Sequence, residues 1–250
     1  MSVYQRQVRL RNRDVNLHRT LRTSTMFEWM QEASIRHTEE LGMGREMTLD
    51  RSLLWVVTLQ RAEIERMPEY DECVTLESWP GETMHLLFPR YYRLLDAEGG
   101  TPVAASALWA LVDSETRRMV FPDRYGVRVD GVVTGHEIAL PSPPRRAEGS
   151  DSMSFTVPFS YVDLNGHMNN TRYFDLAEDF LPAAAEGRAL KELSVEYANE
   201  ARLADTLTLT REQAEDAVFL SGETDRKIFR MRLVYEYVNT QHKGERSWHI

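Results

Sequence analysis

The sequence predicts an α+β protein built from two similar units, each a long helix wrapped by a curved antiparallel sheet. Two observations lead to this prediction. Runs of alternating apolar and polar residues, typical of strands, outnumber helical segments, and each half of the chain has one helical segment near its start. Short patterns also recur between the halves in the same order. With 250 residues, the chain can form one large or two small domains with sizeable cores.

The first half is predicted to form a strand, a helix and then four more strands. Residues 3–11 read as the first strand, and residues 25–41 as the helix, with Gly42 as its C-terminal stop. Turn clusters rich in Pro, Gly and Asp separate the strands that follow. These strands are expected at residues 53–66, 73–79, 86–95 and 102–113.

The second half is predicted to repeat this order. Residues 155–159 read as a strand, and residues 171–181 as a helix that Asn169 or Asn170 caps and Pro182 closes. Four strands with alternating buried and exposed faces complete the unit. They are expected at residues 193–198, 206–211, 218–223 and 228–238.

The duplication can be followed by its register. Residues 31–33 match residues 177–179 at an offset of 146, and residues 72–76 match residues 205–209 at an offset of 133. The segment between the halves is rich in Pro, Gly, Arg and Ser, which is typical of a linker. The expected domains are residues 1–125, a linker at 126–152, and residues 153–250.

Composition excludes several classes of protein. A net charge of −9 argues against nucleic acid as the main partner. Hydrophobic residues make up 42% of the chain, but no apolar run is long enough for a membrane helix, and the N-terminus lacks the apolar core of a signal peptide. The single cysteine, Cys73, fits a reducing compartment. We therefore expect a cytoplasmic globular protein.

The most informative segment carries Asp163, Asn165 and His167 just before the second predicted helix. A carboxylate, an amide and an imidazole in alternate positions point to chemistry on a carbonyl. The unpaired N–H groups at a helix N-terminus would favour the oxyanion that forms when an ester or thioester is attacked. In the first half, Asn16 and His18 are expected to lie in a different register from the helix, so the pattern is lost there.

Five stretches of the chain carry a resemblance to a known family. They are L-L-W-V-V-T-L-Q at residues 53–60, S-A-L-W-A-L-V-D at 106–113, T-R-R-M at 116–119, V-D-L-N-G-H-M-N-N-T-R-Y at 162–173 and V-E-Y-A-N-E-A at 195–201. Along nearly its whole length, the chain resembles the acyl-acyl-carrier-protein thioesterases of plants and bacteria. The element D-x-N-x-H-x-N-N is fairly specific for thioesterases of the hotdog class, and its pairing with the upstream W-V-V-T strand and the downstream E-Y-x-x-E is specific for this family.

The resemblance implies a tandem (double) hotdog fold, and hydrolysis of fatty acyl-acyl-carrier-protein thioesters without a cofactor. A hotdog thioesterase that acts on acyl-CoA, or a hotdog protein that binds acyl groups without hydrolysing them, remains an alternative. The catalytic residues implied by the family motif are Asp163, Asn165, His167 and Glu200. Plant members usually have a cysteine directly after this glutamate, whereas this chain has Ala201, which puts a cysteine nucleophile in doubt.

The chemistry of a thioester fits these residue types. A thiol with a pKa around 8.5 leaves without much protonation, so an enzyme needs mainly an activated water and an oxyanion site. Glu200 and His167 are suited to orient and deprotonate the water, and Asn165 to hold the carbonyl oxygen. Asp163 is suited either to orient these groups or to attack the thioester itself. The seven histidines show no H-x-x-x-H or H-E-x-x-H pair, so no metal site is expected.

The first unit is expected to bind the acyl chain between its helix and its sheet. Its large apolar side chains are the candidates for the pocket: Met26, Trp29, Met30, Trp55, Val57 and Trp109. The expected partner is an acyl carrier protein with its phosphopantetheine-linked acyl chain, and a homodimer is possible. Because this carrier is acidic, its docking site should be basic. The candidates are Arg117, Arg118, Arg172 and Lys191, with Arg172 best placed because it lies close to the catalytic loop.

Overall fold

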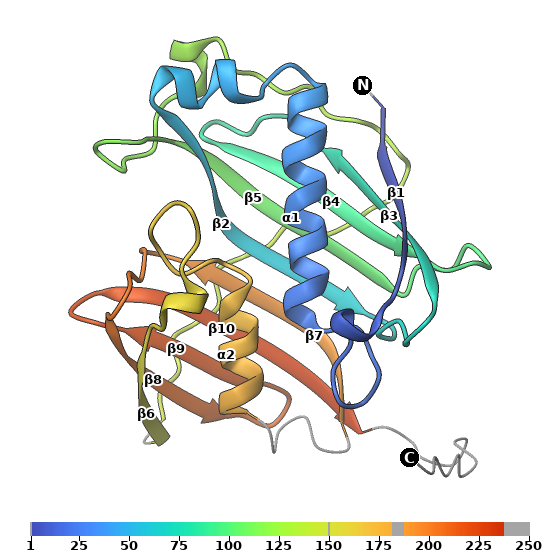
Figure 1. The fold of residues 1–250 in the computed structure, drawn as a ribbon, viewed down its shortest axis with the longest axis vertical. Coiled ribbons are helices and arrows are strands. Elements are labelled where there is room, and N and C mark those ends of the chain that lie inside the picture. Colours follow the sequence, from blue (N-terminus) through green and yellow to red (C-terminus); the bar gives the residue numbers. More distant parts are fainter. Residues whose placement is uncertain (1, 150, 182–187, 238–250) are drawn as a thin grey trace.

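The computed structural model describes residues 2–149, 151–181 and 188–237, and both halves of the chain follow the predicted order of elements (Figure 1). The first unit consists of β1 (Tyr4–Arg9), α1 (Thr23–Glu40), β2 (Leu53–Ile64), β3 (Cys73–Pro80), β4 (Leu87–Leu95) and β5 (Val103–Asp113). The second unit consists of β6 (Asp151–Thr156), α2 (Arg172–Phe180), β7 (Arg188–Tyr197), β8 (Thr206–Gln213), β9 (Val218–Glu223) and β10 (Lys227–Tyr237).

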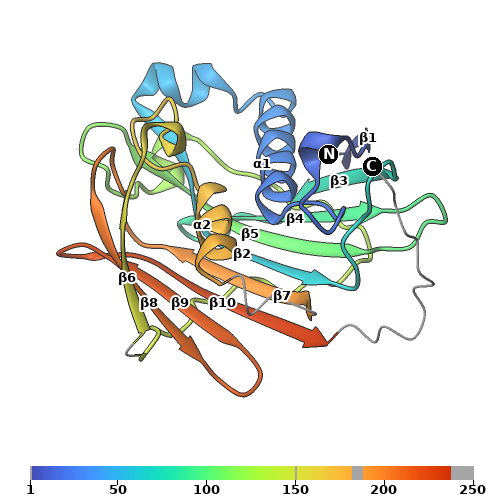
Figure 2. The same cartoon turned by 60° about the horizontal axis from the view of Figure 1, so that its bottom comes forward.

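The ten strands in the described part of the chain form one antiparallel sheet in the order β1-β3-β4-β5-β2-β7-β10-β9-β8-β6. The two units are mirrored in this order about the β2–β7 pair, where Gln60 lies opposite Val195. Both helices lie on the same face of the curved sheet, as Figure 2 shows. The predicted duplication is therefore confirmed, and backbone hydrogen bonds join the two copies edge to edge.

The strands β6 and β7 differ most from the sequence prediction. β6 spans Asp151–Thr156, whereas residues 155–159 were expected, because Pro158 ends the strand and a short 3₁₀ turn follows at Phe159–Tyr161. β6 is a polar edge strand, so it lacks the alternation that marks a half-buried strand. β7 begins at Arg188, five residues before its predicted start. The predicted helix stop at Pro182 and the last residue of the final predicted strand lie outside the described residues.

One hydrophobic core runs through both units and includes residues of both helices. Where α1 meets α2, the rings of Phe27 and Phe174 stack with their centroids 4.4 Å apart, and each side chain is 1% exposed. Tyr173 packs edge-on against Phe229 of β10 below α2. The helices are thus held against the sheet and against each other by aromatic side chains. None of the described helices is both long enough and apolar enough to cross a lipid bilayer.

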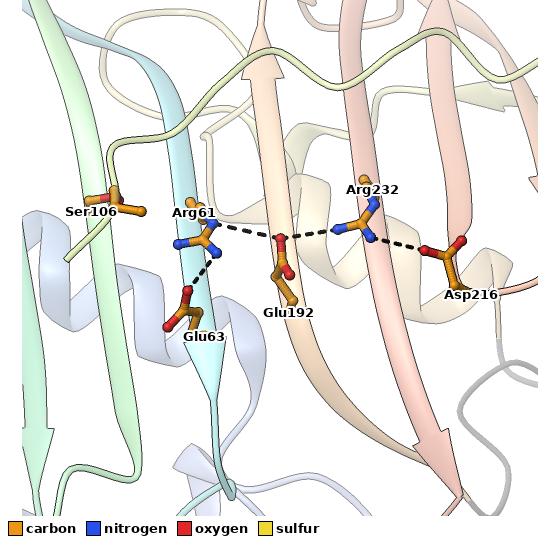
Figure 3. Close-up of polar contacts among 7 residues, drawn as sticks. Arg61, Glu63, Ser106, Glu192, Asp216 and Arg232 are labelled. Carbon is orange, nitrogen blue, oxygen red and sulfur yellow. Dashed lines mark hydrogen bonds and ion pairs between the residues drawn. The ribbon is translucent and has the colours of Figure 1, made fainter.

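The outer face of the sheet carries a row of ion pairs that crosses the boundary between the units (Figure 3). Arg61 on β2 lies 3.6 Å from Glu192 on β7, and Arg232 on β10 lies 3.0 Å from the same carboxylate. Arg232 also pairs with Asp216, and Arg61 with Glu63. A shared row of charges is worth more than an isolated surface pair, so it reinforces the backbone ladder between β2 and β7.

Residues 127–149, which contain no helix or strand, run across this outer face from the first unit to the second. Ser106 of β5 donates a hydrogen bond to the carbonyl of Ala139 (2.6 Å), and the N–H of Ala147 donates to Ser221 of β9 (2.9 Å). Arg145 pairs with Glu212 through two hydrogen bonds and lowers the pKa of that carboxyl to about 2. The connecting segment is therefore anchored to both units along its length.

A polar cluster lies beneath the C-terminal half of α1, inside the first unit. The Ser34 and Tyr92 hydroxyls are 2.6 Å apart and buried, and Arg90 of β4 reaches Ser78 of β3. His37 is 1% exposed, and neither of its ring nitrogens has a hydrogen-bond partner among the described residues. Burial, and then the positive charge of Arg90, lower the pKa of His37 to about 4.

We expect Phe174→Ala to lower the free energy of unfolding by about 3–5 kcal/mol, because it leaves a cavity between the two helices. Urea denaturation of the purified protein measures this effect. Phe159→Ala is the matched control, since that ring is 82% exposed and its loss should change stability by less than about 0.5 kcal/mol. Equal losses in the two variants would contradict the role given to the Phe27–Phe174 contact.

The lowered pKa of His37 predicts a loss of stability in mild acid. Between pH 6.5 and pH 4 the unfolded chain binds a proton at this residue that the folded chain does not, so stability falls as the pH falls. The total loss should approach about 3 kcal/mol. Urea denaturation at a series of pH values should show a flatter profile for His37→Gln than for the wild type. His18→Gln removes an exposed histidine, so a flattening there as well would contradict this assignment.

Candidate active site

The turn that carries Asp163, Asn165 and His167 lies between β6 and α2. The N–H of Asp163 donates to the carbonyl of His167, and the N–H of Gly166 donates to the carbonyl of Asp163, both at 3.0 Å. Gly166 has φ +80°, in the left-handed region that glycine adopts without strain. The Asp163 carboxylate accepts the N–H of Asn165 at 2.8 Å. Backbone groups and the first side chain of the turn therefore hold it closed.

The turn is fixed against the loop that follows β7. The N–H of Met168 donates to the carbonyl of Ala201 at 2.7 Å, and His167 forms an isolated antiparallel bridge with Arg202. These contacts bring Nε2 of His167 to 3.9 Å from Oε1 of Glu200, and the two side chains are 16% and 26% exposed. The structure thus places together two predicted catalytic residues that are far apart in the sequence.

Asp163 and Asn165 occupy different positions from this pair. The second carboxylate oxygen of Asp163 accepts a long hydrogen bond, 3.4 Å, from the side-chain amide of Asn169. Asn165 is exposed near the tip of the turn. No hydrogen bond or ion pair joins either side chain to His167 or Glu200 in the described part of the chain. Among the side chains of the four predicted catalytic residues, only those of His167 and Glu200 therefore form an ion-pair contact with each other.

The start of α2 differs from the sequence prediction. The N-cap position is Thr171, and neither Asn169 nor Asn170 occupies it. Asn169 instead stabilises the approach to the helix, because its side-chain oxygen accepts both the N–H and the hydroxyl of Thr171 at 2.9 and 2.8 Å. An extra backbone turn, Arg172 N–H to Asn169 carbonyl, separates the predicted catalytic turn from the helix. The turn therefore precedes the helix N-terminus by several residues.

The same turn occurs in the first unit, with different side chains. Asn16 takes the place of Asp163: its oxygen accepts the N–H of His18 at 2.9 Å, and its N–H donates to the carbonyl of Thr20. The expected difference in register lies in the distance from the turn to the helix. Leu21 and Met168 hold equivalent positions after the two turns, but α1 begins two residues after Leu21, whereas α2 begins four residues after Met168. The first unit keeps the backbone of the turn, but Asn16 and Thr20 stand where the second unit has Asp163 and His167.

Three arginines surround Glu200. Arg117 Nη1 lies 3.3 Å from one carboxylate oxygen, Arg202 Nη2 lies 3.8 Å from the other, and Arg226 donates to the backbone carbonyl at 3.4 Å. Of these, the sequence singled out only Arg117, and for partner docking. Arg202 could have been predicted only because it follows the motif residue Glu200 by two positions. No feature of the sequence indicates that Arg226 lies near the site. The site is positively charged despite the negative net charge of the chain.

Arg117 reaches this site from the first unit. It lies in the turn after β5, which Asp113 stabilises. The side chain of Asp113 accepts the N–H groups of Glu115 and Thr116, and its backbone carbonyl accepts the N–H of Arg117. Arg117 has φ +55°, an uncommon conformation for a residue with a side chain. The contact between Arg117 and Glu200 therefore connects the two units at the candidate site.

The other predicted docking residues lie in different surroundings. Arg172 pairs with Asp175 at 2.8 Å and Glu28 at 3.3 Å, at the rim of a polar cavity that Glu178 and Asp179 also line, so its surroundings are acidic. The amine of Lys191 donates to the carbonyl of Glu65 at 2.6 Å. Arg118 is exposed. Arg172 is thus less suited to bind an acidic partner than the arginines around Glu200.

A mostly apolar cavity of about 220 Å³ lies between the C-terminal half of α1 and strands β2, β4 and β5. Trp55 and Trp109 line it, and the Trp55 ring packs edge-on against Phe88 with centroids 4.7 Å apart. Leu53 and Leu54 line it too, and Leu53 pairs with Asp113, the residue from which the Arg117 turn starts. One wall of the cavity therefore lies beside the end of β5 from which the Arg117 turn starts.

Four other predicted pocket residues do not line this cavity. Met26 and Met30 are fully buried in the main core, because they lie on the N-terminal half of α1, away from the cavity. Trp29 packs against the same core, and Val57 is 5% exposed within it. Among the described residues there is also no group of three or more His, Cys, Asp or Glu side chains that could hold a metal ion.

Comparison with known families gives two consecutive matches, one for each half of the chain. Residues 1–124 match the N-terminal domain of acyl-ACP thioesterases, and residues 145–248 match the C-terminal domain. The chain belongs to the acyl-ACP thioesterase family. Among curated relatives, two acyl-[acyl-carrier-protein] hydrolases of Cuphea viscosissima are 23% and 24% identical over 98% and 96% of this chain. The chain spans 62% and 60% of the length of these relatives.

Solved structures support the fold. An acyl-ACP thioesterase from Bacteroides thetaiotaomicron superposes with a TM-score of 0.80 at 18% identity, covering 94% of this chain and 98% of its own. The 12:0-ACP thioesterase of Umbellularia californica gives 0.76 at 21% identity, covering 94% of each chain. A structure from Lactobacillus plantarum named as an oleoyl thioesterase gives 0.81 at 26% identity, covering 95% and 97%. The double hotdog fold predicted from the sequence is confirmed.

Proposed function

We propose that the protein hydrolyses the thioester of fatty acyl-acyl carrier protein, releasing a free fatty acid and so ending chain elongation. The observation that carries this proposal is the His167–Glu200 pair, which lies beside Arg117, an arginine from the unit that also holds the apolar cavity. Family membership and the similarity to plant acyl-[acyl-carrier-protein] hydrolases support the substrate class. A cytoplasmic location stays a prediction.

The geometry of the pair suits activation of water. A separation of 3.9 Å is too long for a direct hydrogen bond, but one water molecule can contact both His167 Nε2 and Glu200 Oε1. Arg117 and Arg202 lie beside the carboxylate of Glu200, and this carboxylate can accept a proton from that water. The thiolate leaves without needing a strong acid. The arginines around the site would also stabilise negative charge on the thioester oxygen.

Asp163 is better suited to orienting the site than to attacking the thioester. Both of its carboxylate oxygens accept hydrogen bonds inside the turn, from the N–H of Asn165 and the amide of Asn169. In this reading Asn165, at the exposed tip, contacts substrate as it binds. A cysteine nucleophile is not part of the proposal, because Ala201 is fully buried and Cys73 is exposed on β3 in the other unit.

We expect Glu200→Ala and His167→Ala to lower kcat on acyl-ACP by at least about a hundredfold, the usual scale for a positioned acid or base. Asp163→Asn should also lower kcat while leaving the fold intact, because Asn16 closes the equivalent turn in the first unit. Turnover assays and circular dichroism of each variant measure the two effects. Cys73→Ala should be nearly silent. Near-normal turnover in Glu200→Ala would remove it from the mechanism.

The arginines near Glu200 predict where the acidic carrier protein docks. Arg226→Glu should raise KM for acyl-ACP more than for the matching acyl-CoA. The reason is that the new glutamate repels a protein partner with many acidic groups more strongly than it repels a small thioester. Raising the salt concentration should separate the two substrates in the same way. Arg6→Glu, on the edge strand β1, is the control for an exposed arginine elsewhere. Equal effects on both substrates would favour acyl-CoA as the natural thioester.

A further inference from the structure

The wall of the apolar cavity includes an arginine, Arg90 of β4. Its side chain is 5% exposed and extends beneath α1. Most of the other lining residues are apolar, among them Trp55, Phe88 and Trp109. A cavity built only to hold an alkyl chain gains nothing from a buried cation, because removing a charge from water is costly.

The guanidinium of Arg90 is only partly satisfied. Its Nε donates to the Ser78 hydroxyl at 2.9 Å, and its Nη1 lies 3.5 Å from the Thr38 hydroxyl, at the limit for a hydrogen bond. Its Nη2 is buried and has no partner in the described part of the chain. Within the same part of the chain, no carboxylate lies within 4.0 Å of Arg90, and burial lowers its pKa.

A second largely buried arginine on the same strand has a counter-ion within the protein. Arg93 lies three residues further along β4, and its guanidinium contacts the carboxylate of Glu77 at 2.5 Å, with both side chains largely buried. Arg93 therefore has a counter-ion in the protein, whereas Arg90, which is more deeply buried, has none among the described residues. The guanidinium of Arg90 can therefore bind a negatively charged group that enters the cavity.

The position of Arg90 fits the far end of a bound chain. Arg90 lies opposite Ala107 on β5. Asp113, where the turn that carries Arg117 starts, follows Ala107 by six residues on the same strand. At about 3.3 Å per strand residue, Ala107 and Asp113 are about 20 Å apart along β5. A chain that enters beside Glu200 and follows the cavity along β5 would bring its end to Arg90.

We propose that the cavity accepts an acyl chain that ends in a carboxylate, and that Arg90 binds this carboxylate. The inference rests on the proposed thioesterase function only for the placement of the thioester beside Glu200. A carboxylate matches the two terminal nitrogens of a guanidinium and supplies the negative charge that Arg90 lacks. A methyl end offers neither, and a hydroxyl end offers one acceptor without charge. The Thr38 hydroxyl lies beside the same position.

Binding of non-hydrolysable ligands tests this inference. The probes are amide analogues of acyl-pantetheine with chains of equal length that end in a methyl, a hydroxyl or a carboxylate group, titrated by calorimetry. The measured quantity is the ratio of the Kd of the methyl-ended analogue to that of the carboxylate-ended one. We expect Arg90→Met to lower this ratio by about 10- to 100-fold, the scale of losing a charged hydrogen-bond partner. Arg93→Met, whose arginine has Glu77 as counter-ion, should leave it unchanged.

Two further measurements separate ligand binding from a structural role. The unfolding temperature of unliganded Arg90→Met should stay level or rise, since a similarly long apolar side chain replaces a buried charge without a counter-ion. If that variant does not fold, Arg90→Lys serves instead. Lysine keeps the positive charge but lacks the two parallel N–H groups that bind a carboxylate, so the ratio of the two Kd values should fall several-fold.

An unchanged ratio in the folded Arg90 variant would overturn the inference, as would a preference of the wild type for the methyl or the hydroxyl end. Because the analogues are not hydrolysed, this result is independent of whether acyl-ACP is a substrate. A wild-type protein that fails to hydrolyse acyl-ACP but discriminates the chain ends through Arg90 would refute the proposed function and keep the inference.

Discussion

The backbone ladder between β2 and β7 is the constraint on which the candidate site depends. It fixes the register of the two units, with Gln60 opposite Val195, and so sets where the loop after β7 lies relative to the turn after β5. Only in that arrangement does Arg117 of the first unit reach Glu200 of the second. The ion pairs on the outer face and the anchored connecting segment protect the same register. Neither unit alone contains both the cavity and the His167–Glu200 pair.

The sequence predicted the order of helices and strands because most strands have one buried face, which leaves an alternating pattern. It failed at β6, a polar edge strand without that pattern. His167 and Glu200 were predictable because they belong to specific motifs. The role of Arg117 was not, since its contact with Glu200 depends on pairing between residues far apart in the chain. Only Trp55 and Trp109 of the six predicted pocket residues line the cavity. Helical periodicity places Met26 and Met30 on a buried face without showing which part of α1 borders a cavity.

Charge is distributed in opposite ways at the two ends of the proposed substrate path. Around Glu200, Arg202 and Arg226 are exposed to solvent, so they can attract a partner at a distance and are weakened by salt. Arg90 is buried, so its charge acts only on what enters the cavity, and salt screens it little. The same residue type thus serves long-range attraction at the surface and short-range discrimination inside. Net charge alone, which is negative, reveals neither.

The paired turns at Asp163 and Asn16 separate what the backbone encodes from what the side chains add. Both turns dock on the following loop in the same way: the N–H of Met168 bonds to Ala201, and that of Leu21 bonds to Pro68. In the first unit the scaffold is complete, yet Asn16 and Thr20 take the places of Asp163 and His167. The backbone geometry of the candidate site therefore does not depend on its catalytic side chains, since the turn at Asn16 adopts the same geometry without them. A duplicated protein of this kind can lose or gain chemistry in one half while its architecture stays intact.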